Sequence, residues 1–353
     1  MAISNIYNVE VVEREIVLPA LPLQEHVLPF SNIDLTIPAL ASSLSNALVS
    51  FDAFAGRLVS NGVGETELVC NNKGVEFAKA YALTSLAQVE FCNPIAAVTE
   101  FRCGGIVWGC TFDHRVADAF SANMFFTNWS NISTNKMTES ISSSFTRSIL
   151  VPRDPPNCCS EINKMYMKLQ PLPKPIKQIP QPARASRIYY LGAKDIEKLQ
   201  HSANEQGNNY SKLEAFSAYF WKLLIQCQEI KDTINCNIRI AIDGRSRLKK
   251  MGLPANYLGN VLSTAFAAGN ASAIKEEPHN WVANLIHDAI HSAANEEYFQ
   301  SLVDLVEMSK PSIVAPRDFV KGDEPVLVVS SGLRFPLYEI DHGWGKSILA
   351  SYF

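Results

Sequence analysis

The sequence predicts a layered α/β protein with two domains. The chain has 353 residues, of which 47% are apolar and 19% are charged, so it can bury a sizeable core. Predicted helices and strands alternate in both halves of the chain, which is typical of layered α/β folds. A proline-dense stretch divides the chain near its middle, and chains of this length more often form two domains than one.

The proline-dense stretch is QPLPKPIKQIPQPAR, residues 170–184. Its five prolines exclude a helix or an interior strand and favour an extended, semi-rigid spacer. We therefore predict an N-terminal domain over residues 1–169, a linker over 170–184 and a C-terminal domain over 185–353. The alternative is a proline-rich surface loop within one domain.

The elements follow from apolar spacing and capping residues. In the first half, residues 103–112 are apolar and aromatic, which predicts a buried strand, and the residues after Asp118 show helical spacing. In the second half, Ser211 and Glu214 form a capping box that opens a helix. Residues 236–244 and 325–333 are predicted strands. Residues 281–307 are predicted to form one long helix or two consecutive helices.

Charge and cysteine usage exclude several functional classes. The net charge is −4, from 31 basic and 35 acidic side chains, so no bulk positive field indicates a nucleic-acid or membrane partner. No apolar stretch approaches the length of a membrane span, and the first forty residues do not resemble a signal peptide. The eight cysteines show no CxxC spacing, which argues against zinc ribbons and disulfide scaffolds. We expect a soluble, cytoplasmic protein.

The sequence contains no Walker, GxGxxG, HExxH or GxSxG motif. The segment that best indicates catalytic chemistry is Phe112-Asp-His114-Arg-Val-Ala-Asp118. His114 follows the predicted strand, where a cleft could reach its imidazole, and histidine can accept a proton at neutral pH. Asp118 could cap the following helix or pair with an arginine. Taken alone, the pattern is better explained by a packed histidine and a helix-capping aspartate.

Two further segments strengthen the first interpretation. Residues 242–248 contain Asp243 and Arg245 and are followed by Asn-Tyr-Leu-Gly-Asn at 256–260, and Asp-His-Gly-Trp-Gly stands at 341–345. Each segment alone could be turn chemistry. Together with the HxxxD motif, these segments resemble the plant BAHD acyl-CoA-dependent acyltransferases. The resemblance also covers the proline-rich connection, LPLQEHVLPFSNIDL near the N-terminus and FDAFAGRL.

The resemblance implies a two-domain, chloramphenicol-acetyltransferase-like layered sandwich with mixed sheets and a solvent channel between the domains. It implies acyl-CoA as co-substrate, no bound cofactor, no metal and a small-molecule alcohol or amine as acceptor, and we expect a monomer. His114 would be the general base. Asp118 would turn away from the site and pair with an arginine, for which Arg245, near Asp243, is our candidate. The 341–345 loop would be structural, through Asp341, Gly343, Trp344 and Gly345.

Other positions are assigned by weaker correspondence. Ser211 and Lys212 could meet a CoA phosphate at a helix N-terminus, although a plain helix cap explains them better. Some hydroxycinnamoyl-transferring members stabilise the oxyanion with a tryptophan where this chain has Gly332, and Ser330 or Ser331 could substitute. Arg317 falls near the position of a basic residue that grips the acceptor carboxylate in shikimate-using members.

The sequence departs from the family at several places. His342 replaces the usual phenylalanine of the DFGWG loop, and Ala119 replaces the glycine that follows HxxxD. The chain is also short for the family: a strand is expected but missing between residues 40 and 45, the stretch over 93–102 is short, and eight residues follow Gly345. Either segments of a full protein are omitted here or the chain is a truncated variant.

The leading functional hypothesis is an acyl-CoA-dependent O-acyltransferase of plant specialised metabolism. Its acceptor would be a phenylpropanoid alcohol such as coniferyl alcohol, with acetyl-CoA or a hydroxycinnamoyl-CoA as donor. The alternatives are N-acylation of an amine or polyamine, a shikimate-type hydroxycinnamoyltransferase, and a truncated, non-catalytic homologue.

Overall fold

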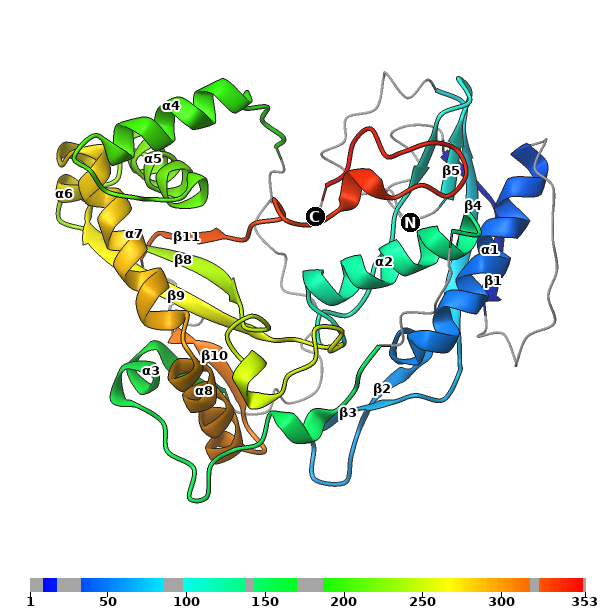
Figure 1. Cartoon of the computed structure of the whole chain (residues 1–353), viewed down its shortest axis with the longest axis horizontal. Coiled ribbons are helices and arrows are strands. Elements are labelled where there is room, and N and C mark those ends of the chain that lie inside the picture. The colour runs from blue at the N-terminus through cyan, green and yellow to red at the C-terminus, as the bar shows by residue number, and fades with distance from the viewer. Residues whose placement is uncertain are drawn as a thin grey trace.

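The computed structural model describes residues 9–17, 33–84, 98–136, 143–169, 187–317 and 324–351. Helices and strands alternate throughout these ranges, as the sequence predicts (Figure 1). The two largest sheets each combine parallel and antiparallel pairs. The predicted α/β class with mixed sheets is therefore confirmed.

The first sheet has the strand order β1-β4-β5-β6. Its strands are β1 (Val9–Val17), β4 (Val75–Ala82), β5 (Val98–Phe101) and β6 (Ile106–Trp108), and only β4 and β5 pair in parallel. A separate hairpin joins β2 (Arg57–Ser60) to β3 (Thr66–Val69). Helices α1 (Ile33–Ser50) and α2 (Ala119–Ser133) lie side by side against the first sheet (Figure 1).

The second sheet has the order β11-β8-β9, formed by β11 (Val326–Val329), β8 (Asn235–Asp243) and β9 (Leu262–Asn270). Its helices are α4 (Ala193–Asn204), α5 (Lys212–Cys227), α6 (Ala271–Glu276) and α7 (His279–Ala293). A smaller unit combines α3 (Ser160–Met165), α8 (Glu296–Ser309), β7 (Tyr166–Leu169) and β10 (Ile313–Pro316), in which the two strands pair antiparallel.

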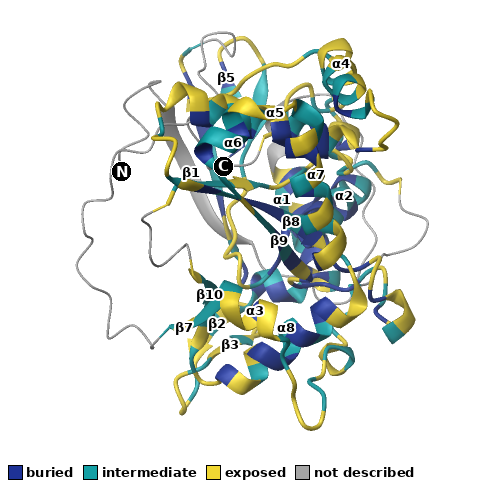
Figure 2. Ribbon diagram, turned by 90° about the vertical axis from the view of Figure 1, so that its left-hand side faces the viewer, coloured by how far each residue is buried: buried dark blue, intermediate teal, exposed yellow. Residues whose placement is uncertain are grey.

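The described residues form two hydrophobic cores, which appear as dark segments in Figure 2. The first lies between α1 and α2, where Phe51 and Phe125 meet edge to face with ring centroids 5.5 Å apart. The second lies between the β11-β8-β9 sheet and its helices and includes Trp221 and Ile238. Burial of such large apolar side chains stabilises each half by about 1.5–3 kcal/mol per residue.

The two cores do not divide the chain by position alone. Residues 149–166 contribute Ile149, Ile162 and Tyr166 to the second core, while Ile340 and Trp344 pack on the first. The chain therefore passes from the first core to the second and returns to the first, and Leu258 of the 256–261 loop also packs in the first core. The proline stretch at 170–184 lies outside the described residues, and the boundaries 1–169, 170–184 and 185–353 stay a prediction.

Most predicted elements are present, with corrections at their ends. The strand predicted over 103–112 is only Ile106–Trp108, because Gly104 adopts a positive φ of 79° in the turn that joins β5 to β6. The stretch 281–307 forms two helices, since the Asn295 side chain accepts the Tyr298 N–H at 2.9 Å and starts α8. The strand predicted over 325–333 ends at Val329. Helix α1 runs without interruption through residues 40–45.

Helices α2 and α5 begin where the capping residues predict. Asp118 caps α2 and Ser211 caps α5, the latter in a reciprocal capping box with Glu214. In the part of the chain that the structure describes, no helix has the length and apolar character needed to cross a membrane.

Candidate active site

Asp118 anchors the N-terminal end of α2. Its Oδ1 accepts the backbone N–H of Ser121 at 2.9 Å, and its Oδ2 accepts the N–H of Val261 at 3.1 Å. Only 1% of Asp118 is exposed. A carboxylate this deeply buried needs full hydrogen bonding and a counter-charge, and the residue that supplies the counter-charge comes from the second half of the chain.

Arg245, in the loop after β8, is that partner. Its Nη1 donates to Asp118 Oδ2 at 2.8 Å and to Asp243 Oδ1 at 2.8 Å, and its Nη2 donates to Asp118 Oδ1 at 3.1 Å. The guanidinium also donates to the carbonyls of Tyr257 and Gly259. The predicted Asp118–Arg245 pair is thus present in the structure, although 127 residues separate its members.

Further contacts make this cluster a fixed junction between the two halves. Ser121 Oγ accepts from Arg245 Nη2 and from the N–H of Gly259, each at 3.0 Å. The guanidinium lies 4.3 Å from the ring centroid of Phe120, a favourable cation–π position. Loss of either Asp118 or Arg245 would leave the other charge buried without a counter-charge, which is strongly destabilising. The ion pair therefore fixes the position of the 256–261 loop on α2.

His114 lies in the turn just before α2, six residues beyond the end of β6. It is exposed, and its backbone carbonyl accepts from Asn260 Nδ2 at 2.7 Å. On its two sides, Asp113 and Arg115 form an exposed ion pair at 2.6 Å, and that guanidinium lowers the pKa of the Asp113 carboxyl to about 2. The turn is therefore held by the same 256–261 loop that binds Asp118, with the imidazole at the surface, where a substrate can reach it.

The 341–345 loop folds around the Asp341 carboxylate. Oδ1 accepts the N–H groups of Gly343 at 2.8 Å and of Gly345 at 3.0 Å, and these hydrogen bonds lower the pKa of Asp341 below its ordinary value. Both glycines have positive φ, 99° and 101°, a conformation that glycine adopts without strain. The Asp-x-Gly-x-Gly pattern is thus explained by its own geometry.

This loop is fastened to the C-terminal part of α2. Ser130 Oγ donates to the carbonyl of Asp341 at 2.8 Å and accepts its N–H at 2.9 Å, and Lys136 lies 3.7 Å from its carboxylate. Helix α2 spans roughly 22 Å at 1.5 Å per residue. The loop is therefore far along the helix from His114, as a structural role requires.

His342 is buried among three tryptophans. Its ring centroid lies 4.8 Å from Trp129, 5.5 Å from Trp108 and 6.2 Å from Trp344. Its Nδ1 is 2.7 Å from Ser133 Oγ, while its Nε2 has no hydrogen-bond partner among the described residues. Burial lowers the pKa of His342 to about 4, so the imidazole is neutral at physiological pH and fills the place of an aromatic residue.

The remaining predicted positions lie apart from this cluster. Ser211 caps α5, and Lys212 lies 3.7 Å from Glu197, an exposed ion pair. Ser331 follows β11 and accepts the N–H of Leu333 at 3.4 Å, with Ser330 beside it. Arg317 donates to the carbonyl of Asn163 at 3.2 Å. These contacts give no sign of a ligand, and the substrate-binding roles of the five residues stay predictions.

Sequence reasoning did not assign roles to several residues that build the site. Asn260 and Val261 hold His114 and Asp118, and Ser130 and Ser133 hold the 341–345 loop. Asn260 ends the Asn-Tyr-Leu-Gly-Asn segment and Val261 follows it, whereas no signal in the sequence singles out Ser130 or Ser133. Among the described residues, no three His, Cys, Asp or Glu side chains are grouped so as to hold a metal ion.

A model of the Transferase family matches residues 34–97 and 94–353. The chain belongs to this family, the BAHD acyltransferases. The two matched ranges overlap at residues 94–97. BAHD acyltransferases use acyl-CoA as co-substrate, and this chain is accordingly an acyltransferase.

Known relatives support the same assignment. Shikimate O-hydroxycinnamoyltransferase of Nicotiana tabacum is 28% identical, with 97% of this chain and 89% of that protein covered. Vinorine synthase has a similar fold, with a TM-score of 0.65, 18% identity and coverage of 96% and 87%. TRI101 of F. graminearum, complexed with coenzyme A and T-2 mycotoxin, has a TM-score of 0.68, 13% identity and coverage of 91% and 82%. The predicted two-domain fold is confirmed by these structures.

Proposed function

We propose that this BAHD acyltransferase transfers an acyl group from a CoA thioester to the hydroxyl of a phenylpropanoid alcohol such as coniferyl alcohol, with His114 as general base. The proposal is carried by the buried Asp118–Arg245 junction. It fixes the 256–261 loop on α2, and this loop holds the His114 turn through Asn260. The histidine is positioned by contacts that leave its imidazole exposed for the reaction.

In the proposed reaction, the imidazole of His114 takes the proton of the acceptor hydroxyl while the oxygen attacks the thioester carbonyl carbon. The tetrahedral intermediate collapses with cleavage of the C–S bond, and the thiolate of CoA takes the proton from the imidazolium. The products are an ester and free CoA. A thioester is already activated, so positioning and one proton acceptor are sufficient without a covalent enzyme intermediate.

An alcohol acceptor is favoured over an amine by the charge of a pocket next to the His114 turn, described below. Among the residues that line it, Glu307 is the single carboxylate, and Lys310 neutralises it at 2.8 Å. A cationic amine or polyamine would require a free carboxylate there. N-acylation is therefore the second candidate, and a shikimate-type acceptor would need a basic side chain such as Arg317 to turn from the Asn163 carbonyl.

The experiment combines acetyl-CoA, p-coumaroyl-CoA and malonyl-CoA separately with coniferyl alcohol, shikimate and spermidine. Free CoA is measured with a thiol reagent, and the product is identified by mass spectrometry. We expect a coniferyl ester from acetyl-CoA or p-coumaroyl-CoA. An amide of spermidine, or a shikimate ester in its place, would move the assignment to that acceptor. If no donor and acceptor pair releases CoA above the buffer control, the chain is a non-catalytic homologue.

We also propose that the chain acts as a monomer in the cytoplasm. Light scattering coupled to size-exclusion chromatography tests the first statement: a mass near 39.0 kDa is expected, and a mass near twice that value would contradict it.

A further inference from the structure

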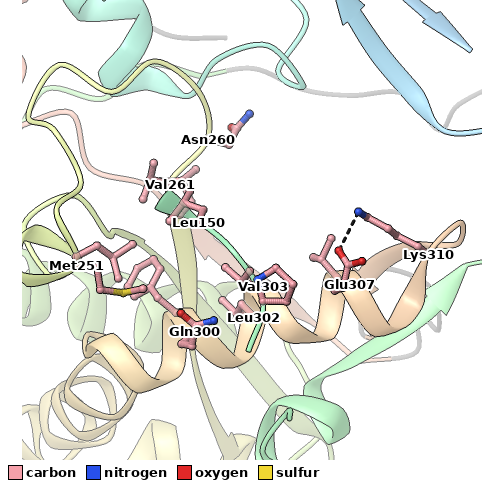
Figure 3. Close-up of a pocket in the computed structure, with 14 residues that line it drawn as sticks. Leu150, Met251, Asn260, Val261, Gln300, Leu302, Val303, Glu307 and Lys310 are labelled. Atoms are coloured by element: carbon pink, nitrogen blue, oxygen red, sulfur yellow. Dashed lines mark ion pairs between the residues drawn. The ribbon is translucent and has the colours of Figure 1, made fainter. Parts of the chain in front are cut away.

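A pocket of about 350 Å³ lies between α8 and the loops that follow Arg245 (Figure 3). It is assembled from segments near residues 150, 248–251, 260–262 and 299–310. Its floor is buried and apolar, and intermediate or exposed apolar side chains form the walls and mouth. The side chains that define it are Leu248, Met251, Val261, Phe299, Val303 and Val306.

Two neighbouring residues tie this pocket to the HxxxD motif. Asn260 lines the pocket and donates to the carbonyl of His114 at 2.7 Å. Val261, in its floor, donates its N–H to Asp118 at 3.1 Å. The pocket and the candidate base are therefore built on the same short loop, and a molecule bound in the pocket lies next to the His114 turn.

A third connection runs through Phe299. Its ring packs so closely on Gly244 that a Cβ at that position would lie 2.4 Å from Phe299 Cε1. Gly244 precedes Arg245, so the turn that carries the buried arginine also sets the place of the ring in the pocket wall. The ring is buried against this turn, and an aromatic ring in a pocket wall favours edge-to-face or offset contact with a second aromatic ring.

The polar groups of the pocket favour a neutral ligand. Lys310 and Glu307 form an ion pair at 2.8 Å, 52% and 40% exposed, on the side of the pocket away from Met251 (Figure 3). The pair leaves little net charge at this side. Ligand pockets in proteins span roughly 300–1,000 Å³ and are lined mostly by apolar groups, so a pocket of about 350 Å³ suits one aromatic ring with a short side chain.

We propose that this pocket binds the planar aryl group of a phenylpropanoid substrate beside His114, and that Val303 and Met251 set the size of the ring it accepts. The inference rests on the proposed function and names the substrate-binding residues for it. The aryl group has two possible sources, the acceptor alcohol and the hydroxycinnamoyl group of the donor, and both present the same chemistry to the pocket.

The test measures binding by isothermal titration calorimetry on the full chain carrying His114→Ala, so that no turnover is needed. The ligands are coniferyl alcohol, p-coumaroyl-CoA and acetyl-CoA. Val303→Phe fills the pocket, and Val63→Phe, the same change at a 69% exposed position between β2 and β3, is the control. We expect Val303→Phe to weaken binding of at least one aryl ligand tenfold or more, with acetyl-CoA binding unchanged.

The pattern of loss distinguishes the two sources. Weaker binding of coniferyl alcohol assigns the pocket to the acceptor, and weaker binding of p-coumaroyl-CoA assigns it to the donor. The proposal is overturned if both aryl ligands bind Val303→Phe as they bind the Val63→Phe control, or if acetyl-CoA loses affinity equally. Aryl binding by a chain that releases no CoA would contradict the proposed reaction while supporting the pocket.

A second variant serves if Val303→Phe does not fold, which circular dichroism would show. Met251→Ala enlarges the pocket, so an aryl alcohol with two methoxy groups should gain affinity relative to coniferyl alcohol by threefold or more. An unchanged ratio would count against the assigned role of Met251.

Discussion

The buried imidazole of His342 provides a direct test of the loop that joins the C-terminal segment to α2. Its pKa is about 4, against an ordinary value of 6.5, because burial among Trp108, Trp129 and Trp344 disfavours the charged form. At 1.36 kcal/mol per pKa unit, a pKa about 2.5 below the ordinary value means that burial disfavours the charged imidazole by about 3 kcal/mol relative to the neutral form.

The direction in which pH changes the free energy of unfolding follows from proton linkage. Above pH 6.5 the imidazole is neutral in both states, so its full contribution to stability is present. As pH falls from 6.5 towards 4, the unfolded chain binds a proton at this residue and the folded chain does not, so the free energy of unfolding decreases. Between pH 7.5 and pH 5 the expected loss from this residue is about 2 kcal/mol.

The perturbation is His342→Phe, which places the family's usual residue in the same aromatic surroundings. Ser133 keeps a partner in this variant, because its hydroxyl lies 2.9 Å from the carbonyl of Trp129. The free energy of unfolding would be measured by urea titration at pH 7.5 and pH 5, with tryptophan fluorescence as signal. Comparison with the wild type cancels the contributions of the carboxylates, and the exposed His201→Phe is the matched control.

We expect the wild type and His201→Phe to lose about 2 kcal/mol more than His342→Phe between the two pH values. An equal loss in His342→Phe and the wild type would refute the reasoning, because it would mean that the imidazole is protonated in the folded chain or is not buried.

The other predictions concern the junction and the loop. Asp118→Asn should lower the free energy of unfolding by about 3–5 kcal/mol, because it leaves Arg245 buried with a weakened counter-charge. Asp113→Asn, which breaks an exposed pair, should cost less than about 1 kcal/mol because water screens it; equal losses in urea titration would contradict the assigned burial. Gly343→Ala should cost about 1–2 kcal/mol, because its φ of 99° strains any residue with a Cβ. Gly62→Ala, also in open space but without a positive φ, should cost less than 0.5 kcal/mol in thermal melts, and similar melting temperatures for the two variants would disprove the strain.

Local signals explain why the helices could be predicted. Asp118 and Ser211 stand just before helical apolar spacing, and each caps a helix in the structure. Strand ends were less accurate, because a short turn such as that at Gly104 leaves the apolar pattern intact while it reverses the chain. Asn295 similarly divides 281–307 into two helices through one side-chain hydrogen bond.

The site depends on contacts between residues far apart in the sequence, which no local spacing of residues can predict. Arg245 meets Asp118 across 127 residues, and only the resemblance to a known family indicated the pair. Ile340 packs on the first core and Ile162 on the second, although each lies in the other half of the sequence. The local sequence around either residue does not indicate which core it joins. The pocket on α8 draws residues from four segments, so no local motif could predict it.

The central claim, that His114 is the general base, is tested most directly by CoA release from His114→Ala under conditions where the wild type turns over. General-base catalysis contributes roughly 10²–10⁴-fold, so the rate should fall by at least about 100-fold. His201→Ala should keep the wild-type rate, and both variants should unfold at the same urea concentration as the wild type. Equal release of CoA by His114→Ala and the wild type would show that His114 is not the base.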